Sequence, residues 1–130
     1  MSSIPNDLRY TKSHEWVRLG PDGAVEIGIS EHAQSALGDL VFVEVPEVGR
    51  ALSAGEACAV VESVKAASDV FSPVSGKVIA GNTLLSAKPE LVNQDPYGAG
   101  WLFRVQSDSP PAGALMSAAD YAQYLADEVK

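Results

Sequence analysis

The sequence is short of basic residues and of long apolar runs. Lys and Arg total 9 against 17 Asp and Glu, which gives a formal net charge of −8. A nucleic acid would repel such a chain. No apolar run approaches the length of a membrane span, and the first residues lack the pattern of a signal or transit peptide. We therefore expect a cytoplasmic protein that binds neither nucleic acid nor membrane.

Cysteine and histidine are too scarce for several kinds of site. The single cysteine, Cys58, cannot form an intrachain disulfide, and its apolar neighbours favour a packing role over catalysis. The two histidines, His14 and His32, are too few for a histidine-rich metal site. The sequence also contains no Ser/His/Asp set and no phosphate-binding glycine loop. It predicts neither a metal centre nor a catalytic residue.

Short apolar strands dominate what is present. With 130 residues, 46% of them hydrophobic, the chain can bury a real core, and we expect one domain over residues 1–130. Alternating apolar residues and turn signals predict strands at residues 14–19, 24–29, 40–45, 57–61, 70–71, 77–80 and 101–105. Strands of this length and spacing are typical of a β-barrel or sandwich.

One short helix and one long loop interrupt these strands. Ser30 is an N-cap for a helix over residues 31–37, which Gly38 ends. Residues 82–96 contain asparagine and proline at several positions, and we interpret them as a loop.

The end of the chain predicts a second helix. Residues 107–113 form a Pro/Ser spacer, and Ser117 with Asp120 three residues later forms a capping signature. The helix should cover about 117–128 and dock on the barrel through an apolar face that includes Tyr121.

The most informative stretch is residues 60–72, where a polar segment separates two apolar strands. Ser63, Ser68 and Asp69 favour turns, so the pattern predicts a hairpin with Lys65 at its tip. A lysine there is exposed, held in a fixed place and accessible to an acylating enzyme. A solvated turn lysine is the alternative.

The hairpin resembles the modified-lysine hairpin of lipoyl and biotinyl carrier domains. Residues 62–69 read ESVKAASD and residues 72–78 read SPVSGKV. Biotin carriers usually have methionine on both sides of the lysine, and lipoyl domains of 2-oxoacid dehydrogenases usually have aspartate before it. This chain has Val64 and Ala66 at those positions. The residues that would form the recognition hairpin around Lys65 are Glu62, Ser63, Val64 and Ala66.

Further segments extend the resemblance to glycine cleavage system H proteins. They read YTKSHEWV at residues 10–17, GISEHAQ at 28–34, LGDLVFV at 37–43 and NQDPYGAGWL at 93–102. The similarity runs from about residue 8 to residue 125. It implies a mainly β fold, a hybrid of barrel and sandwich with short helices, and lipoate in amide linkage on Lys65.

The resemblance also implies a non-catalytic carrier and its partners. The carrier would take the aminomethyl group of glycine from glycine decarboxylase to a tetrahydrofolate-dependent aminomethyltransferase, and electrons to dihydrolipoamide dehydrogenase. A lipoate ligase or a lipoyl or octanoyl transferase would attach the cofactor. Two alternatives remain: an H-like lipoate donor or regulatory module, and a free-standing lipoyl domain of a 2-oxoacid dehydrogenase.

Finally, the resemblance implies a surface cleft for the loaded arm. Its candidate residues are Ser13, Glu15 and Asp69, whose oxygens could accept hydrogen bonds from a cationic amine. The alternative is that all three lie on exposed turns. Lys77 is the nearest competitor for modification, although its surroundings resemble the start of a strand and favour a solvated surface lysine.

Overall fold

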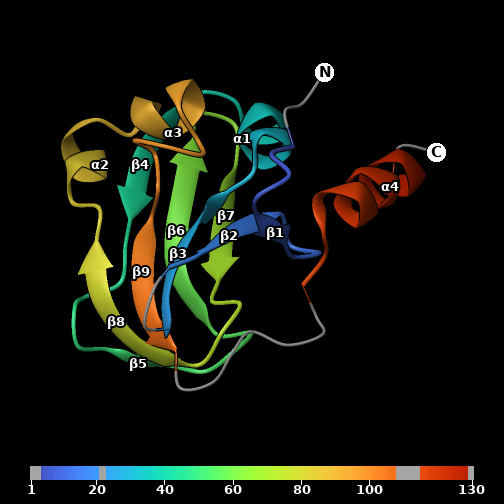
Figure 1. The fold of residues 1–130 in the computed structure, drawn as a ribbon. Helices are drawn as coiled ribbons and strands as arrows, with labels where there is room; N and C mark the ends of the chain where they lie inside the picture. Colours follow the sequence, from blue (N-terminus) through green and yellow to red (C-terminus); the bar gives the residue numbers. More distant parts are fainter. Residues whose placement is uncertain (1–3, 21–22, 108–114, 129–130) are drawn as a thin grey trace.

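The computed structural model describes residues 4–20, 23–107 and 115–128 and is mostly β (Figure 1). The strands are β1 (Arg9–Tyr10), β2 (Glu15–Leu19), β3 (Ala24–Ile29), β4 (Leu40–Glu44), β5 (Ala51–Leu52), β6 (Ala57–Ser63), β7 (Ala67–Phe71), β8 (Gly76–Gly81) and β9 (Phe103–Ser107). The helices are α1 (Glu31–Leu37), α2 (Leu84–Ala87), α3 (Glu90–Gln94) and α4 (Ala118–Glu128). Among the described residues, no helix is long and apolar enough to cross a membrane.

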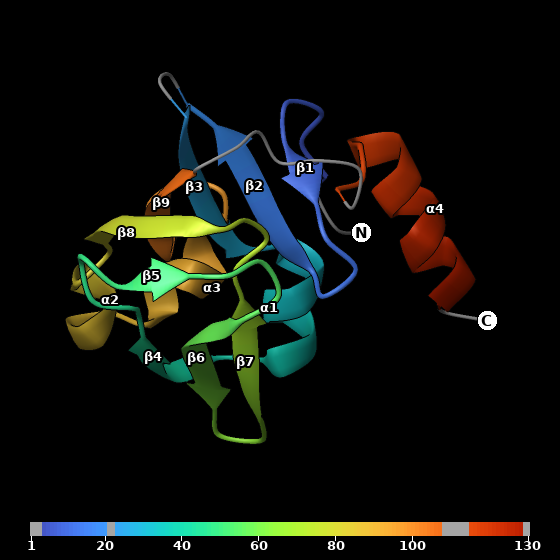
Figure 2. The ribbon, with the colours of Figure 1, turned by 90° about the horizontal axis from the view of Figure 1, so that it is seen from below.

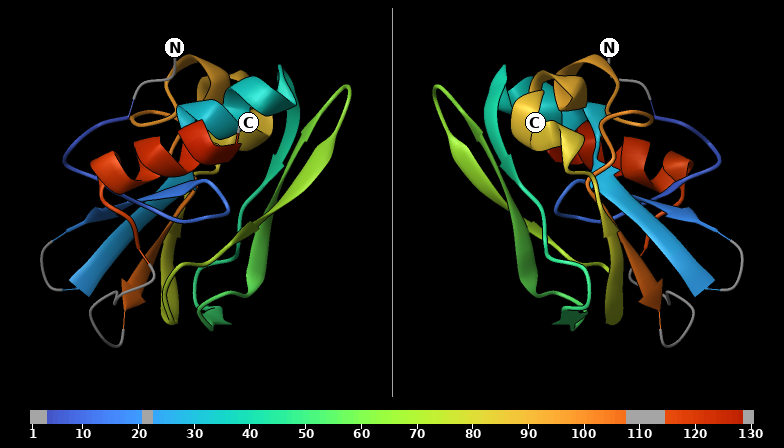
Figure 3. Two further views of the ribbon diagram at one scale, coloured as in Figure 1. Left: turned by 90° about the vertical axis from the view of Figure 1, so that its right-hand side faces the viewer. Right: turned by 90° about the vertical axis from the view of Figure 1, so that its left-hand side faces the viewer.

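Two antiparallel sheets face each other (Figure 3). The larger sheet has six strands in the order β1-β2-β3-β9-β8-β5, and the smaller has three in the order β4-β6-β7. Each sheet has two edge strands, so neither closes on itself. The predicted hybrid of barrel and sandwich is confirmed as a mainly β, two-sheet fold, with the sandwich character more pronounced than the barrel.

The main core lies between the sheets, because alternate residues of each strand point to the same face. Its fully buried members from the larger sheet include Val17, Ile27, Phe103 and Val105, and those from the smaller sheet include Val43, Val61 and Val70. A second apolar cluster lies under α4 and consists of Leu8, Tyr10, Trp16, Ala118, Tyr121 and Leu125. Within it, the rings of Tyr10 and Tyr121 stack with centroids 4.5 Å apart.

Both predicted helices are confirmed, together with their caps. The Ser30 side chain accepts a hydrogen bond from the Ala33 N–H, and α1 covers the predicted residues. Ser117 Oγ accepts one from the Asp120 N–H at 3.1 Å, at the start of α4. Burial of Tyr121 confirms that α4 docks on the β-structure, where it lies beside β1 (Figure 2).

The interpretation of residues 82–96 as a loop is wrong in part, because α2 and α3 lie within it. Neither helix has a side-chain hydrogen bond at its N-cap, so the local signals are weak. Each instead buries one apolar residue, Leu85 in α2 and Val92 in α3. These single-turn helices are therefore stabilised by tertiary packing, which propensity does not report.

Several strand boundaries also differ from the prediction. The last strand covers Phe103–Ser107 rather than residues 101–105. Strand β7 begins at Ala67 rather than at residue 70, so Ser68 and Asp69, interpreted as turn residues, pair with β6 instead. The two-residue strands β1 and β5 were not predicted. Strands this short carry no periodicity, so only their partners define them. Most of the predicted spacer over residues 107–113 lies outside the described residues.

Candidate cofactor-attachment site

The hairpin between β6 and β7 is confirmed, with Lys65 exposed at its tip. Ser63 closes the turn, since its backbone N–H donates to the Ala66 carbonyl at 2.7 Å. Ser63 Oγ also accepts from the backbone N–H groups of Lys65 and Ala66, at 3.3 and 3.1 Å. A single buried serine thus holds the backbone of the tip. The tip projects beyond the smaller sheet (Figure 3).

Exposed apolar side chains lie on the hairpin tip and on the strand that pairs with β6. Val64 at the tip is 86% exposed, and Val41 and Phe42 on the neighbouring strand β4 are 55% and 44% exposed. A register shift between Leu40 and Phe42 accompanies the exposure of Val41 and Phe42. Exposed apolar side chains next to a candidate modification site are typical of a surface that partners contact.

The lysine side chain itself bends toward the C-terminal end of α1. A Cβ atom added to Gly38, which follows that helix, would lie 3.3 Å from Lys65 Cε and 3.9 Å from Nζ. The hairpin tip and the end of α1 are therefore in contact through this one side chain.

Glu15 lies at the junction of the two sheets rather than on an exposed turn. Glu15 is buried, with only 2% of its surface exposed. One carboxylate oxygen accepts a 2.6 Å hydrogen bond from the Thr11 hydroxyl, and the other accepts from the Phe71 N–H at 3.3 Å. Desolvation raises the pKa of Glu15, and the bonds from Thr11 and Phe71 oppose that rise. Glu15 thus connects β2 to the edge strand β7, an arrangement we call the β2–β7 junction.

The other two cleft candidates are exposed on either side of this junction. Ser13 lies two residues before Glu15, in the turn between β1 and β2, and Asp69 lies on β7, two residues before Phe71. The structure therefore brings the Ser13–Glu15 segment next to β7. A cleft for the arm stays a prediction.

His14 connects the Ser13–Glu15 segment to α1 and α4. Its backbone has a φ of 72°, a conformation that costs a non-glycine residue energy. His14 Nδ1 lies 2.9 Å from the Tyr121 hydroxyl, which lies 2.7 Å from Ser30 Oγ. The rings of His14 and His32 are 4.9 Å apart. The sequence carries no local signal for this long-range cluster, which joins the β1–β2 turn, α1 and α4.

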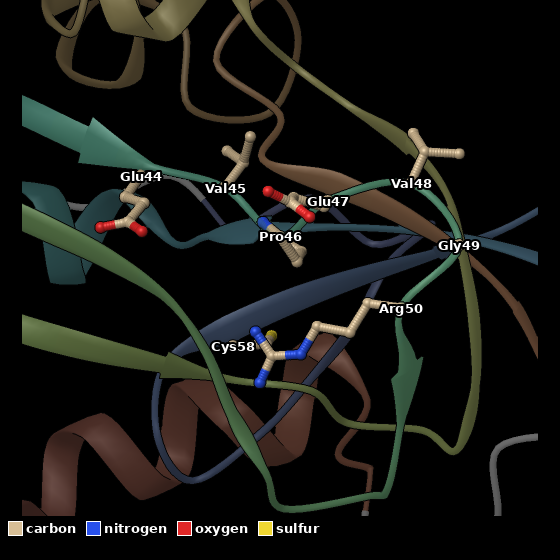
Figure 4. Close-up of a pocket in the computed structure, with 8 residues that line it drawn as sticks. All are labelled: Glu44, Val45, Pro46, Glu47, Val48, Gly49, Arg50 and Cys58. Atoms are coloured by element: carbon tan, nitrogen blue, oxygen red, sulfur yellow. The ribbon is translucent and has the colours of Figure 1, made fainter.

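A cavity of about 530 Å³ lies at the end of β4 and the start of β6, away from the hairpin tip, and Figure 4 shows its lining residues. It is lined by Glu44, Val45, Pro46, Glu47, Val48, Gly49, Arg50 and Cys58. Burial raises the pKa of the Cys58 thiol to about 12, and the thiol donates to the Val70 carbonyl at 3.7 Å. Cys58 therefore stays protonated and packs, as predicted. It lies near the start of β6, whereas Lys65 follows its end, so the cavity is separate from the attachment site.

A two-sheet β fold with an exposed lysine at a fixed hairpin tip is the arrangement that the resemblance to carrier domains implies. Comparisons with known proteins identify the family. The glycine cleavage H-protein family matches residues 8–128. The chain is 58% identical to a glycine cleavage system H protein of Halorhodospira halophila over 129 residues, 98% of this chain and 99% of that relative. It is also 58% identical to one of Azoarcus sp. over 128 residues, 98% of this chain and 100% of that relative.

A solved structure agrees with these relatives. The crystal structure of a glycine cleavage system H protein from Mycobacterium marinum has a TM-score of 0.85 and 44% sequence identity, and the match covers 98% of this chain and 100% of that one. The chain belongs to the glycine cleavage H-protein family.

Proposed function

We propose that this protein is the lipoyl-lysine carrier of the glycine cleavage system, with lipoate joined through an amide bond to Lys65. The observation that carries the proposal is the exposed lysine at the tip of a serine-closed hairpin, in a chain of this family. Lipoate supplies a disulfide that accepts both a carbon group and electrons, which no side chain offers. The chain's own task is to hold that group where partners can reach it.

The residues present fit this cofactor. Lipoylation requires a primary amine that an enzyme can approach, and Lys65 is exposed with no strand on its outer side. Lys77 is also exposed, but it lies within β8, opposite Ala51 on one neighbouring strand and Gln106 on the other. A lysine on the face of a three-strand ladder presents its amine with less freedom than one at a tip. The geometry therefore favours Lys65.

The partners follow from the proposed role. The carrier takes the aminomethyl group of glycine from glycine decarboxylase to the tetrahydrofolate-dependent aminomethyltransferase, and electrons to dihydrolipoamide dehydrogenase. It catalyses none of these steps itself. A lipoate ligase or a lipoyl or octanoyl transferase modifies Lys65, in the cytoplasm. A tethered group gains from a high effective concentration once a partner is docked.

The β2–β7 junction is the proposed resting place of the cargo amine. A cationic amine is best accommodated by carboxylates. The carboxylate of Glu15, on β2, lies next to Phe71 of β7, and the carboxylate of Asp69 is exposed on β7 itself. Ser13 adds a hydroxyl at the neighbouring turn. The hydrogen bonds from Thr11 and Phe71 keep the Glu15 carboxylate in one orientation.

Complementation tests the carrier role against the alternatives. A bacterial strain that lacks its H protein should regain glycine cleavage when this chain is expressed, and the Lys65→Arg variant should not restore it. An H-like lipoate donor would instead restore lipoylation of other enzymes without glycine cleavage. The match over residues 8–128 already disfavours a lipoyl domain of a 2-oxoacid dehydrogenase.

A further inference from the structure

The Lys65 side chain rests on a residue that has no side chain of its own. A Cβ atom at Gly38 would come within 3.3 Å of Lys65 Cε, so the end of the lysine would have to shift by a few tenths of an ångström. Gly38 also has a φ of 88°, which disfavours other residues. Its backbone conformation therefore favours glycine, and an added methyl group would displace the lysine.

Two hydrogen bonds hold the backbone of Gly38, and a third holds the Asn93 side chain that makes one of them. Its N–H donates to the Gln34 carbonyl at 3.0 Å and ends α1. Its carbonyl accepts from Asn93 Nδ2 at 2.9 Å, and Asn93 Oδ1 accepts from the Leu40 N–H at 2.9 Å. Gly38 is thus tied to α1, α3 and β4, and it offers the lysine a rigid surface.

Charge complementarity adds to this contact. The C-terminal end of a helix carries a partial negative charge that favours a nearby cation, and α1 has no basic residue in its last turn. Nζ of Lys65 would lie 3.9 Å from a Gly38 Cβ, so the hairpin brings a cation to that end. Acylation replaces the ammonium by a neutral amide and removes this attraction.

We propose that Gly38, held by Gln34 and Asn93, is a seat that orders the unmodified Lys65 side chain for acylation and releases it afterwards. The inference rests on the proposed lipoylation of Lys65 for its second half. The step itself uses an acyl adenylate as donor: the Lys65 nitrogen forms the C–N bond, the C–O bond to AMP breaks, and two protons pass to solvent. Gly38 acts through Lys65 and is a positioning residue.

The chain offers a matched control for this test. Gly55 has a φ of 89°, nearly the same as the 88° of Gly38, yet a Cβ there would meet nothing within 4 Å. Gly38→Ala and Gly55→Ala therefore both place alanine at a positive φ, and only the first places a Cβ atom next to the lysine. With purified lipoate ligase, ATP and lipoate, kcat/KM for Gly38→Ala should fall about 3- to 10-fold, while Gly55→Ala should remain close to wild type.

A structural measurement keeps the proposal testable without any enzyme. In the unmodified protein, NMR order parameters of the Lys65 Cε methylene should exceed those of exposed Lys77, and Lys65→Gln should shift the Gly38 amide resonance. Octanoylation of Lys65 should lower its order. Thermal melting of both glycine variants checks that they fold.

The outcomes separate the seat from the proposed function. If wild-type protein accepts no lipoate, the proposed function fails, and the NMR measurements on unmodified protein still judge the contact. If wild type is lipoylated, equal rates for the two alanine variants overturn the seat. Lys65 as mobile as Lys77 overturns it as well.

Discussion

The lysine hairpin is closed by hydrogen bonds between near neighbours in the sequence, whereas the β2–β7 junction depends on bonds between distant residues. The tip is closed by one residue, Ser63, through bonds to neighbours within three positions along the chain. The junction depends on long-range contacts: Glu15 bonds Phe71, 56 positions away, and His14 bonds Tyr121, 107 positions away. Under the proposed function, the lysine that carries a swinging group needs only a local anchor, whereas the surface proposed to receive the cargo needs several elements held together.

The largest expected effect concerns the tip, where one nitrogen atom is the proposed site of acylation. Lys65→Arg should abolish lipoylation, because a guanidinium stays protonated and is a poor acyl acceptor. Intact mass after incubation with lipoate ligase should show no lipoyl increment for this variant and one increment for wild type. Lys77→Arg is the matched control and should be modified normally; an increment that disappears with Lys77 would reassign the site.

The free energy of unfolding should depend much more on a buried residue of α4 than on a residue at the hairpin tip. Tyr121 is fully buried and stacks on Tyr10, so Tyr121→Ala should lower the free energy of unfolding by about 3–5 kcal/mol. Val64→Ala, at the 86% exposed tip position, should change it by less than about 0.5 kcal/mol. Urea denaturation measures both. A Val64 variant as damaging as the Tyr121 variant would show that the tip is structurally coupled to the core.

The pH dependence of the free energy of unfolding should distinguish the buried carboxylate of Glu15 from an exposed one. Burial raises the folded-state pKa of Glu15, so its favourable contribution is present below the unfolded-state pKa of about 4.3 and is lost as pH rises through the folded value. The free energy of unfolding can be measured by urea denaturation between pH 4 and pH 7 for wild type and for Glu15→Gln. The value for wild type minus that for Glu15→Gln should increase as the pH falls.

Glu56 provides the opposite sign as a control. Hydrogen bonds from Ser53 and Arg50 lower its pKa, so its contribution is present above the unfolded-state pKa and is lost as pH falls through the folded value. The difference between wild type and Glu56→Gln should shrink on acidification. Parallel pH profiles for the two variants would contradict the assignment of Glu15 to a desolvated junction.

The smallest effect is expected from Asp69, which is exposed on β7. Exposed charge pairs contribute about 0–1 kcal/mol, so Asp69→Asn should speed ammonia loss from the loaded protein by no more than about fivefold. Lipoylation should be unchanged, and high salt should partly mimic the variant. Glu15→Ala should have the larger effect. Wild-type rates in both variants would place the cleft elsewhere.

The sequence predicted the parts whose signals are local. Ser30 and Ser117 predicted the starts of their helices, because a cap requires only a side chain and a backbone N–H three residues apart. The exposed Lys65 followed from turn-forming residues between two apolar runs. In each case the deciding interaction spans a few residues, so it is visible in the order of the letters.

Tertiary structure decided the rest, because the deciding partners are distant in the chain. The burial of Glu15 depends on β7, the positive φ of His14 accompanies its bond to Tyr121, and α2 and α3 form where Leu85 and Val92 reach the core. The contact between Lys65 and Gly38 arises only when the hairpin folds beside α1. Sequence alone thus determined which residue is presented, and the fold decided what surrounds it.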